Sequence, residues 1–543
     1  MLPSHLQHML FQTPTQYPMS DLTSLYDGTI APAACAASSI PYPSLYGAEF
    51  LSLETNLISN YSENVHSSFY SNHGSVNITN ASFCNVTVSY THPGRNDKIN
   101  VQVWLPADSW NGRLQMVGGG GWQAGLSYFS LMAMTAAMGE GYSTVSTDAG
   151  LGSDATPVNW GLLSPGNVNL NLLQDLASVS LNDAAVIAKS ITNSFYGQPP
   201  KYSYFSGCSQ GGRQGLMLAQ KYPEAFDGIA ASAPANNWNS LLMTIAWPQF
   251  LMDSLKEYPP SCEFDAITTA AVEACDGKDG LVDGIVSDDR CVFDPMTLVG
   301  KTINCTNFGT ERQISPTAAT IVQSIWSGPK TRNNTSIWFG PNRDSSFSAG
   351  LYTPAMISND CSSNGTCSRQ PLELSEDWIK LFVLKNASAD LSTMTHEQFD
   401  RVAHASFQEY HSMLDTNDPD LSRFRDRGGK MVGYHGMADA IIPVRGSEYY
   451  YDTVAAMDSN VHDYYRLFLA PGIAHCFGGA GAYPDTTFDA MRKWVEEGTT
   501  PDTLDATIQD TTPAVKRPLC PYPKRQVYRG ISNSATSDQF ECW

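Results

Sequence analysis

The segment YSYFSGCSQGGRQG, residues 202–215, decides the fold that this sequence predicts. Residues 202–206 favour a strand, and the residues from Arg213 to Lys221 have the apolar spacing of a helix. Between them stands the pattern small-x-Ser-x-Gly, with Ser209 at its centre. A sharp strand-to-helix turn of this kind is a nucleophile elbow, in which glycines relieve the crowding around a strained serine. The segment therefore predicts that Ser209 is a nucleophile at the start of a helix.

The flanking sequence repeats the alternation of strand and helix. Residues 83–105 alternate apolar and polar side chains around a Pro-Gly turn, which predicts a β-hairpin, and residues 170–190 carry apolar side chains at helical spacing. Strands that alternate with helices form a parallel sheet with helices on its faces, so the sequence predicts an α/β fold. Five further segments favour strands: 114–117, 142–145, 228–232, 430–434 and 463–469.

The alternation stops between residues 237 and 425, where cysteines, Asn-x-Ser/Thr tripeptides and isolated helical stretches replace it. We therefore predict a catalytic domain formed by residues 1–236 and 426–543, with an inserted domain at 237–425. Aromatic residues of the insert either line an aromatic pocket or form its core, and for each one taken alone the core is the simpler interpretation. They include Trp238, Trp247, Trp326, Trp338 and Phe339.

A serine nucleophile needs a histidine as base and a carboxylate that orients the histidine. In proteins with this elbow, the carboxylate follows the serine along the chain and the histidine comes last. Asp439 follows the strand predicted at 430–434, and His475 follows the one at 463–469. We predict these two as the acid and the base. His435 is a rival base, but it precedes Asp439 on the same loop and suits a structural hydrogen bond better. His462 lies in a polar stretch, where we expect it to face solvent.

Four consecutive glycines, Gly118 to Gly121, follow the strand at 114–117. Backbone N–H groups on such a loop can stabilise an oxyanion, together with the N–H of the residue after the nucleophile. We predict Gly120, Gly121 and Gln210 as the donors, and the sequence leaves open which glycine acts.

A cysteine stands directly beside the predicted nucleophile and another directly beside the predicted base, and this pair of motifs is found in a known family. A disulfide between Cys208 and Cys476 would bring Ser209 and His475 together. This pair of motifs, with the nonapeptide Gly-Cys-Ser-Gln-Gly-Gly-Arg-Gln-Gly at 207–215 and Phe-Asp-Gly-Ile at 226–229, resembles the tannase and feruloyl esterase family of secreted esterases. The resemblance covers residues 35–542.

The resemblance implies an α/β-hydrolase fold with a large inserted lid domain, and Ser209, Asp439 and His475 as the catalytic triad. It implies an aromatic-acid ester as substrate, small or linked to a polysaccharide. A feruloyl ester of the plant cell wall is the first expectation and a gallate ester of tannin the alternative. Two other classes stay open: a serine peptidase, and a binding protein that has lost catalysis.

The resemblance also implies the pairing of the remaining cysteines. We expect these disulfides besides Cys208–Cys476: Cys35–Cys84, Cys275–Cys291, Cys361–Cys367, Cys520–Cys542 and Cys262–Cys305.

An acidic loop in the insert predicts a cation site. Asp276, Asp279 and Asp283 alternate with glycines, and clustered carboxylates are the hard ligands that calcium prefers. The resemblance implies that the backbone carbonyls of Leu281 and Ile285 complete a structural calcium site. The alternative is a series of Asp-Gly turns without metal.

Composition limits the other classes of partner. The formal charge of −21 disfavours binding to nucleic acid. No stretch approaches the roughly 18 apolar residues of a membrane span, and the oligomeric state stays open. Twelve cysteines and nine Asn-x-Ser/Thr tripeptides predict a secreted glycoprotein. Residues 1–10 lack the pattern of a signal peptide, so we expect that a signal was removed or is missing from this sequence. The tripeptides begin at Asn60, Asn77, Asn80, Asn85, Asn304, Asn333, Asn334, Asn364 and Asn386.

Overall fold

A computed structural model describes residues 35–305, 310–348, 355–362, 365–509, 511, 514–530 and 536–543. Residues 1–34 and the tripeptide asparagine Asn364 therefore lie outside the described residues. All statements about the structure below concern the described part of the chain.

A nine-stranded sheet runs through the molecule in the order β1-β2-β3-β5-β4-β8-β9-β14-β15. The pairs from β1 to β5 are antiparallel, and those from β5 to β15 are parallel. The chain therefore enters through a meander and continues as strand-helix-strand crossovers, as predicted. The strands are β1 Glu49–Val65, β2 Val76–Thr91, β3 Ile99–Pro106, β4 Arg113–Val117, β5 Ser143–Thr147, β8 Tyr202–Cys208, β9 Gly228–Ser232, β14 Lys430–Gly436 and β15 Tyr465–Ala470.

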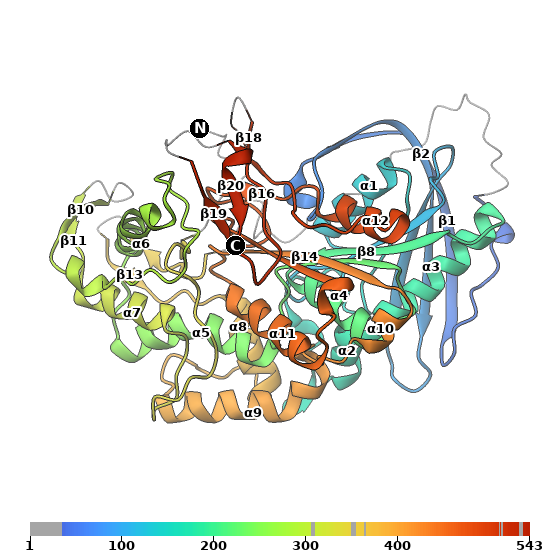
Figure 1. The fold of residues 1–543 in the computed structure, drawn as a ribbon. Coiled ribbons are helices and arrows are strands. Elements are labelled where there is room, and N and C mark those ends of the chain that lie inside the picture. Colours follow the sequence, from blue (N-terminus) through green and yellow to red (C-terminus); the bar gives the residue numbers. More distant parts are fainter. Residues whose placement is uncertain are drawn as a thin grey trace.

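Helices cover both faces of this sheet (Figure 1). One apolar cluster joins α1 and α12 to one face, and another joins α3, α4 and α11 to the other. Burial of apolar surface on both faces is the expected stabilisation of a mainly parallel sheet. The helices are α1 Tyr128–Gly139, α2 Leu170–Gln174, α3 Ser180–Tyr196, α4 Gln210–Lys221, α11 Val444–Met457 and α12 Thr487–Glu497.

The segment 237–425 supplies none of the nine strands and lies beside the C-terminal ends of the parallel strands, on the left in Figure 1. Its core is shared with the rest of the chain, because Trp122, Trp160 and Leu173 belong to the same apolar cluster as α5, α7 and α9. The insert is thus packed onto the loops around the elbow. Its helices are α5 Trp238–Leu255, α6 Ser261–Cys275, α7 Pro316–Trp326, α8 Glu373–Asp377, α9 His396–Leu414 and α10 Ser422–Asp426.

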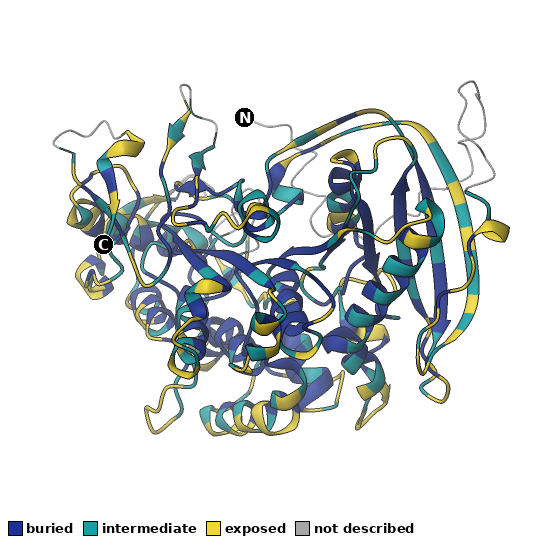
Figure 2. Ribbon diagram, turned by 45° about the vertical axis from the view of Figure 1, so that its right-hand side comes forward, coloured by how far each residue is buried: buried dark blue, intermediate teal, exposed yellow. Residues whose placement is uncertain are grey.

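Two elements differ from the sequence prediction. Strand β1 was not predicted, because its side chains are mostly exposed or half-buried and give no apolar alternation, as Figure 2 shows at the edge of the sheet. The helix predicted over 170–190 is interrupted by a π-helix, Asp175–Val179, between α2 and α3. Short strand pairs complete the chain: β6 Leu162–Ser164 with β7 Asn167–Val168, β10 Thr302–Cys305 with β11 Thr310–Gln313, β12 Asp360–Cys361 with β13 Cys367–Ser368, β16 Ala482–Tyr483 with β17 Thr507–Ile508 and β18 Val515–Lys516, and β19 Gln526–Tyr528 with β20 Phe540–Cys542.

Candidate active site

Ser209 occupies the sharp turn between β8 and α4 that the sequence predicts. Its φ of 65° and ψ of −123° are strained for a residue with a side chain. A Cβ atom on Gly207 would lie 2.7 Å from the backbone of Gly211, and one on Gly212 would lie 2.2 Å from the carbonyl oxygen of Ser232. The turn therefore requires glycine at 207, the first position of the motif, and at 212, one residue beyond it, while a Cβ atom on the second glycine of the motif, Gly211, would lie 3.1 Å from the carbonyl oxygen of Gly119.

The structure brings Asp439, His475 and Ser209 together in a hydrogen-bonded series. Asp439 follows β14 and His475 follows β15, so adjacent parallel strands deliver both loops to the edge of the sheet where β8 ends. The Nε2 of His475 lies 2.9 Å from the Oγ of Ser209, and its Nδ1 lies 2.7 Å from the Oδ2 of Asp439. This arrangement can move a proton from the serine hydroxyl to the imidazole.

Asp439 is buried and ionised in this setting. Its Oδ1 accepts hydrogen bonds from the N–H groups of Ile441 and Ile442, at 2.9 and 2.8 Å. Burial alone would raise the pKa of the Asp439 carboxyl, but the charge of His475 and hydrogen bonds from His435 and His475 outweigh it and hold the pKa well below its usual range. The carboxylate can therefore stabilise a protonated His475.

The two other histidines of this part of the sequence, His435 and His462, lie against residues other than the nucleophile. His435 is fully buried on the far side of Asp439, and its ring nitrogens contact Ser447, Ile442 and Asp439. His462 is half-buried rather than fully exposed, because its Nδ1 lies 2.8 Å from the hydroxyl of Tyr451. In the described residues, neither histidine is hydrogen-bonded to Ser209.

The disulfide Cys208–Cys476 is present and joins the residue before Ser209 to the residue after His475. All twelve cysteines are paired, and the six pairs are those that the resemblance implied. The hydroxyl of Tyr434 also donates to the carbonyl oxygen of Cys476, so the loop that carries His475 is held by a covalent bond and a partly buried hydrogen bond.

Hydrogen bonds within the glycine loop, residues 118–121, show which of its backbone N–H groups could still donate to an oxyanion. Within the described part of the chain, the N–H groups of Gly121 and Gln210 have no acceptor. Gln210 is the first residue of α4, where backbone N–H groups are free by helix geometry. Of the two predicted glycines, only Gly121 therefore has an N–H group that no acceptor in the described residues already uses. Three other N–H groups of the loop are already used, Gly118 by Ser206 O, Gly119 by Gln214 Oε1 and Gly120 by Gln123 O.

Arg213 is a buried residue near the site that the sequence prediction missed. Its guanidinium donates to the Oε1 of Gln210 at 2.7 Å, to the Oγ1 of Thr416 at 3.1 Å, and to the carbonyl oxygens of Leu176 and Ala177. Burial lowers the pKa of this guanidinium to about 9. Arg213 thus ties the elbow helix to the segment that returns from the insert. Apart from Gln210, its partners lie on two segments that are distant in the sequence, at Leu176–Ala177 and at Thr416, so no local motif indicates this role.

The predicted cation loop keeps its carboxylates close to its own backbone. Asp276 accepts from the N–H groups of Asp283 and Gly284, and the Oδ2 of Asp283 lies 2.7 Å from Arg517. Burial raises the pKa values of the Asp279 and Asp283 carboxyls. The three carboxyls of the loop lie near the positive charge of one arginine, Arg517. The oxygen-only donors and this excess of negative charge suit a hard cation, although the oxygens of the three carboxylates do not all lie within 4.8 Å of one another in this structure.

A second charged group was not predicted. In the described residues, only His92, Asp97 and Asp175 bring three possible ligand atoms within 4.8 Å of one another. The ring nitrogens of His92 lie 2.7 Å from Asp97 and 3.2 Å from Asp183, and Arg95 lies 3.5 Å from Asp175. Both ring nitrogens of His92 thus contact carboxylates, and Asp175 faces the guanidinium of Arg95. The group is therefore a buried network of ion pairs. Its members come from a hairpin turn, the π-helix and α3, so sequence spacing could not reveal it.

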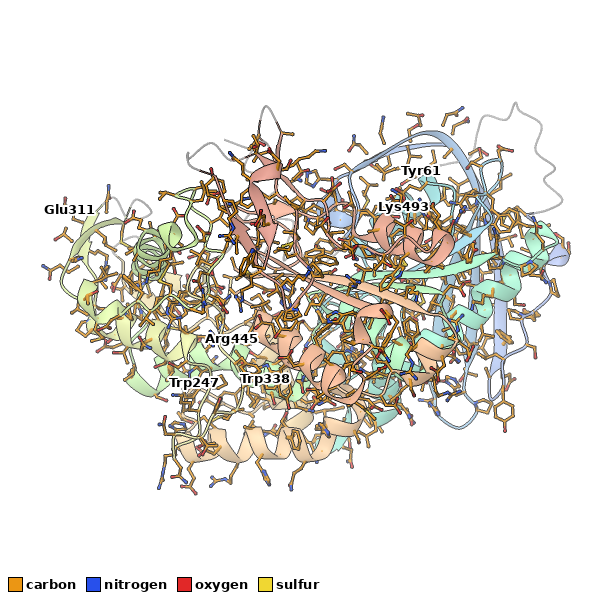
Figure 3. The ribbon with its side chains drawn as sticks, viewed as in Figure 1. Tyr61, Trp247, Glu311, Trp338, Arg445 and Lys493 are labelled. Atoms are coloured by element: carbon orange, nitrogen blue, oxygen red, sulfur yellow. A yellow bond between two sulfur atoms is a disulfide. The ribbon has the colours of Figure 1, made fainter. Side chains whose placement is uncertain are left out.

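The aromatic side chains of the insert are mostly core. Trp238, Trp247 and Trp326 are buried in the cluster that joins the insert to the elbow loops. Trp338, labelled in Figure 3 beside Arg445, is half-buried, packs against Gly446 of α11, and lies 5.9 Å from the ring of Tyr449. For these three of the five aromatic residues the structure therefore favours the core interpretation.

A mainly parallel sheet with an elbow serine, a histidine and a carboxylate from successive strand ends defines a serine hydrolase of the α/β-hydrolase class. No helix in the described part of the chain is long and apolar enough to cross a membrane.

Comparison with known proteins identifies the family. The sequence profile described as "Tannase and feruloyl esterase" matches residues 84–543, so the chain belongs to the tannase and feruloyl esterase family and is a carboxylic ester hydrolase. The resemblance and the α/β-hydrolase fold that the sequence predicted are confirmed.

Three relatives illustrate the similarity. A probable feruloyl esterase of Arthroderma benhamiae is 41% identical over 475 residues, which cover 86% of either chain. The tannase of Aspergillus oryzae is 30% identical over 515 residues, covering 85% of this chain and 86% of the tannase. The solved structure of tannin acyl hydrolase from Aspergillus niger superposes with a TM-score of 0.83 at 28% identity, covering 94% of this chain and 95% of that one.

Proposed function

We propose that this protein is a secreted serine esterase that hydrolyses feruloyl esters through an acyl-enzyme on Ser209. The observation that carries the proposal is the hydrogen-bonded series from Asp439 through His475 to Ser209, with its 2.9 Å contact between the Nε2 of His475 and the Oγ of Ser209. A serine in this position can transfer its proton to the imidazole as it attacks a carbonyl carbon.

The mechanism follows from the positions of these groups. His475 takes the proton of Ser209 as the Oγ attacks the ester carbonyl, and the N–H groups of Gln210 and Gly121 hold the resulting oxyanion. His475 then gives the proton to the departing alcohol, which leaves the acyl group on Ser209. Water, activated by the same histidine, releases the acid. Asp439 stays ionised and stabilises the imidazolium in both halves.

The choice of a feruloyl ester rests on the relative named a probable feruloyl esterase, which is more similar in sequence than the tannase of Aspergillus oryzae. A gallate ester is the second candidate, because the structure superposes on tannin acyl hydrolase over nearly its whole length. Both are esters of aromatic acids, so one catalytic arrangement serves either substrate.

A structural calcium ion at the acidic loop is part of the proposal. The carboxylates of Asp276, Asp279 and Asp283, with the carbonyl oxygens of Leu281 and Ile285, would hold it. Such an ion would neutralise the excess negative charge beside Arg517 and stiffen the insert. It takes no part in the acyl transfer.

Secretion and glycosylation are supported by the cysteine pairs and by surface exposure. Six disulfides persist only in an oxidising compartment. Seven tripeptide asparagines are exposed and so are accessible to a glycan. They are Asn60, Asn77, Asn80, Asn304, Asn333, Asn334 and Asn386.

The decisive experiment measures kcat/KM for the methyl esters of ferulate, coumarate and gallate and for a short aliphatic ester. We expect the hydroxycinnamates to be hydrolysed fastest, and a preference for gallate would favour the tannase alternative. Ser209→Ala should abolish hydrolysis of every ester while the thermal transition stays nearly unchanged. Turnover by that variant would exclude the mechanism, and faster cleavage of a matched amide would indicate a peptidase.

A further inference from the structure

His435 is buried directly behind the carboxylate of the triad. It lies at the end of β14, four residues before Asp439, and neither side chain is accessible to solvent. Its Nε2 lies 3.2 Å from the Oδ2 of Asp439 and 2.9 Å from the carbonyl oxygen of Ile442. Its Nδ1 lies 2.7 Å from the Oγ of Ser447 on α11.

These neighbours determine which nitrogen of His435 carries a proton. Both groups facing Nε2 are acceptors, a carboxylate and a carbonyl, so Nε2 must be protonated to avoid a buried repulsive contact. The hydroxyl facing Nδ1 can donate or accept, and it satisfies that nitrogen in either charge state. The Nε2–H of His435 therefore faces two acceptors, the carbonyl oxygen of Ile442 at 2.9 Å and the Oδ2 of Asp439 at 3.2 Å.

The Oδ2 atom of Asp439 is the oxygen that His435 and His475 share. The Nδ1 of His475 lies 2.7 Å away from it on the catalytic side. The other oxygen, Oδ1, is held by the N–H groups of Ile441 and Ile442. Donors thus surround the carboxylate, and His435 is the one side-chain donor besides His475 among the described residues.

We propose that His435 is a positioning residue of the esterase, which holds the Oδ2 of Asp439 toward His475 through an Nε2 hydrogen bond and disperses part of the carboxylate charge. This inference rests on the proposed function of the triad. A carboxylate that loses this donor can rotate and carries more concentrated charge, so His475 holds its proton more tightly and is less well oriented.

The test compares pH profiles of kcat/KM on a simple aryl ester. His435→Leu removes the donor, and His435→Gln retains an N–H group at a similar reach. For His435→Leu we expect kcat to fall about ten- to a hundredfold, the effect of losing one hydrogen bond to a charged group. Because a more tightly held proton on His475 blocks its action as a base, the acidic limb should move to higher pH by about half a unit or more. His435→Gln should restore most of both quantities.

Two further variants keep the test decisive. Ser447→Ala leaves His435 in place but removes the hydroxyl that orients it, and we expect a smaller shift of the acidic limb in the same direction. His462→Leu changes a histidine that contacts Tyr451 instead of the triad, and it should leave the profile unchanged. Thermal transitions show which variants are folded.

An unchanged acidic limb in folded His435→Leu would overturn the role of His435. If that variant does not fold, an unchanged limb in Ser447→Ala would overturn it equally. A loss of activity that His435→Gln does not restore, with no shift of the limb, would show that His435 serves only packing. These failures are distinct from failure of the proposed function, which turnover by Ser209→Ala would reveal.

Discussion

Cys208 and Cys476 are bonded to each other across 268 residues, so the residue before Ser209 and the residue after His475 are covalently joined. Cys476 has a positive φ of 63°, an unfavourable conformation that the bond helps to hold. The two loops come from β8 and β15, strands that are separated in the sheet by β9 and β14. The disulfide therefore spans the strands between the nucleophile and its base.

Removal of the Cys208–Cys476 disulfide should lower both catalytic activity and stability, and a second disulfide deletion away from the triad shows which effect is specific. Cys208→Ala with Cys476→Ala should lower kcat at least about tenfold, because the 2.9 Å contact between Ser209 and His475 depends on the position of both loops. Loss of stability should be about 2–5 kcal/mol. The matched control is Cys520→Ala with Cys542→Ala, a pair that is not adjacent to the triad and should leave kcat nearly unchanged. Full activity in the first variant would contradict a catalytic role for the bond.

Chelation should destabilise the protein if calcium occupies the acidic loop. At calcium concentrations about a hundredfold above Kd, binding contributes about 2.7 kcal/mol, so EGTA should lower the Tm of a chain of this length by about 2–3 °C. Asp279→Asn should abolish this response, whereas Asp288→Asn should retain it, because Asp288 pairs with Arg290 on the same loop. Scanning calorimetry with and without calcium measures both. An equal Tm for the parent protein with and without EGTA would exclude the site.

The network around Asp175 should make stability depend on pH. Burial and the charge of Asp97 raise the pKa of the Asp175 carboxyl from 3.8 to about 7. The folded state therefore binds a proton more tightly than the unfolded state, and this group makes the free energy of unfolding fall as pH rises from about 4 to about 7. Asp175→Asn mimics the protonated form. It should have little effect near pH 4 and should stabilise the protein at pH 8 by about 1 kcal/mol or more.

Urea unfolding at several pH values measures this difference. Asp108→Asn, a change at an exposed acid on another loop, provides the control. A difference between Asp175→Asn and the parent that does not grow with pH would show that Asp175 is already ionised at low pH in the folded protein.

Glycans should be absent from one of the predicted tripeptides. Asn85 is half-buried in the middle of β2, paired with strands on both sides, and its Oδ1 is shielded from solvent. A glycan needs an exposed side-chain amide, so we expect glycans at exposed asparagines such as Asn60 and Asn334 but none at Asn85. Peptide mass mapping of protein secreted from a eukaryotic host, before and after endoglycosidase, tests this. A glycan on Asn85 would require that β2 is open when the glycan is added.

Local patterns predicted most of the sheet and the residues of the triad. The elbow around Ser209 is recognisable partly because Gly207 is required by a contact with Gly211, within a few residues of the serine. Asp439 and His475 followed from the strands that precede them and from their order in the chain. Strand β1 escaped prediction because an exposed edge strand has no apolar face to reveal it. The aromatic side chains of the insert give a clear apolar signal, but this signal was ambiguous because ligand pockets and apolar cores use the same residue types.

Sequence patterns alone were enough to predict that Ser209 lies on an elbow, that an acid and a histidine follow it after later strands, and that cysteines flank the nucleophile and the base. These features are encoded over short stretches, where backbone geometry limits which residues fit. The folded chain was needed to show that the N–H of Gly120 donates to Gln123 while that of Gly121 has no acceptor among the described residues, and that His435 lies behind Asp439. Those relations depend on which hydrogen-bonding groups meet when separate strands and loops pack together, and spacing along the chain does not specify them.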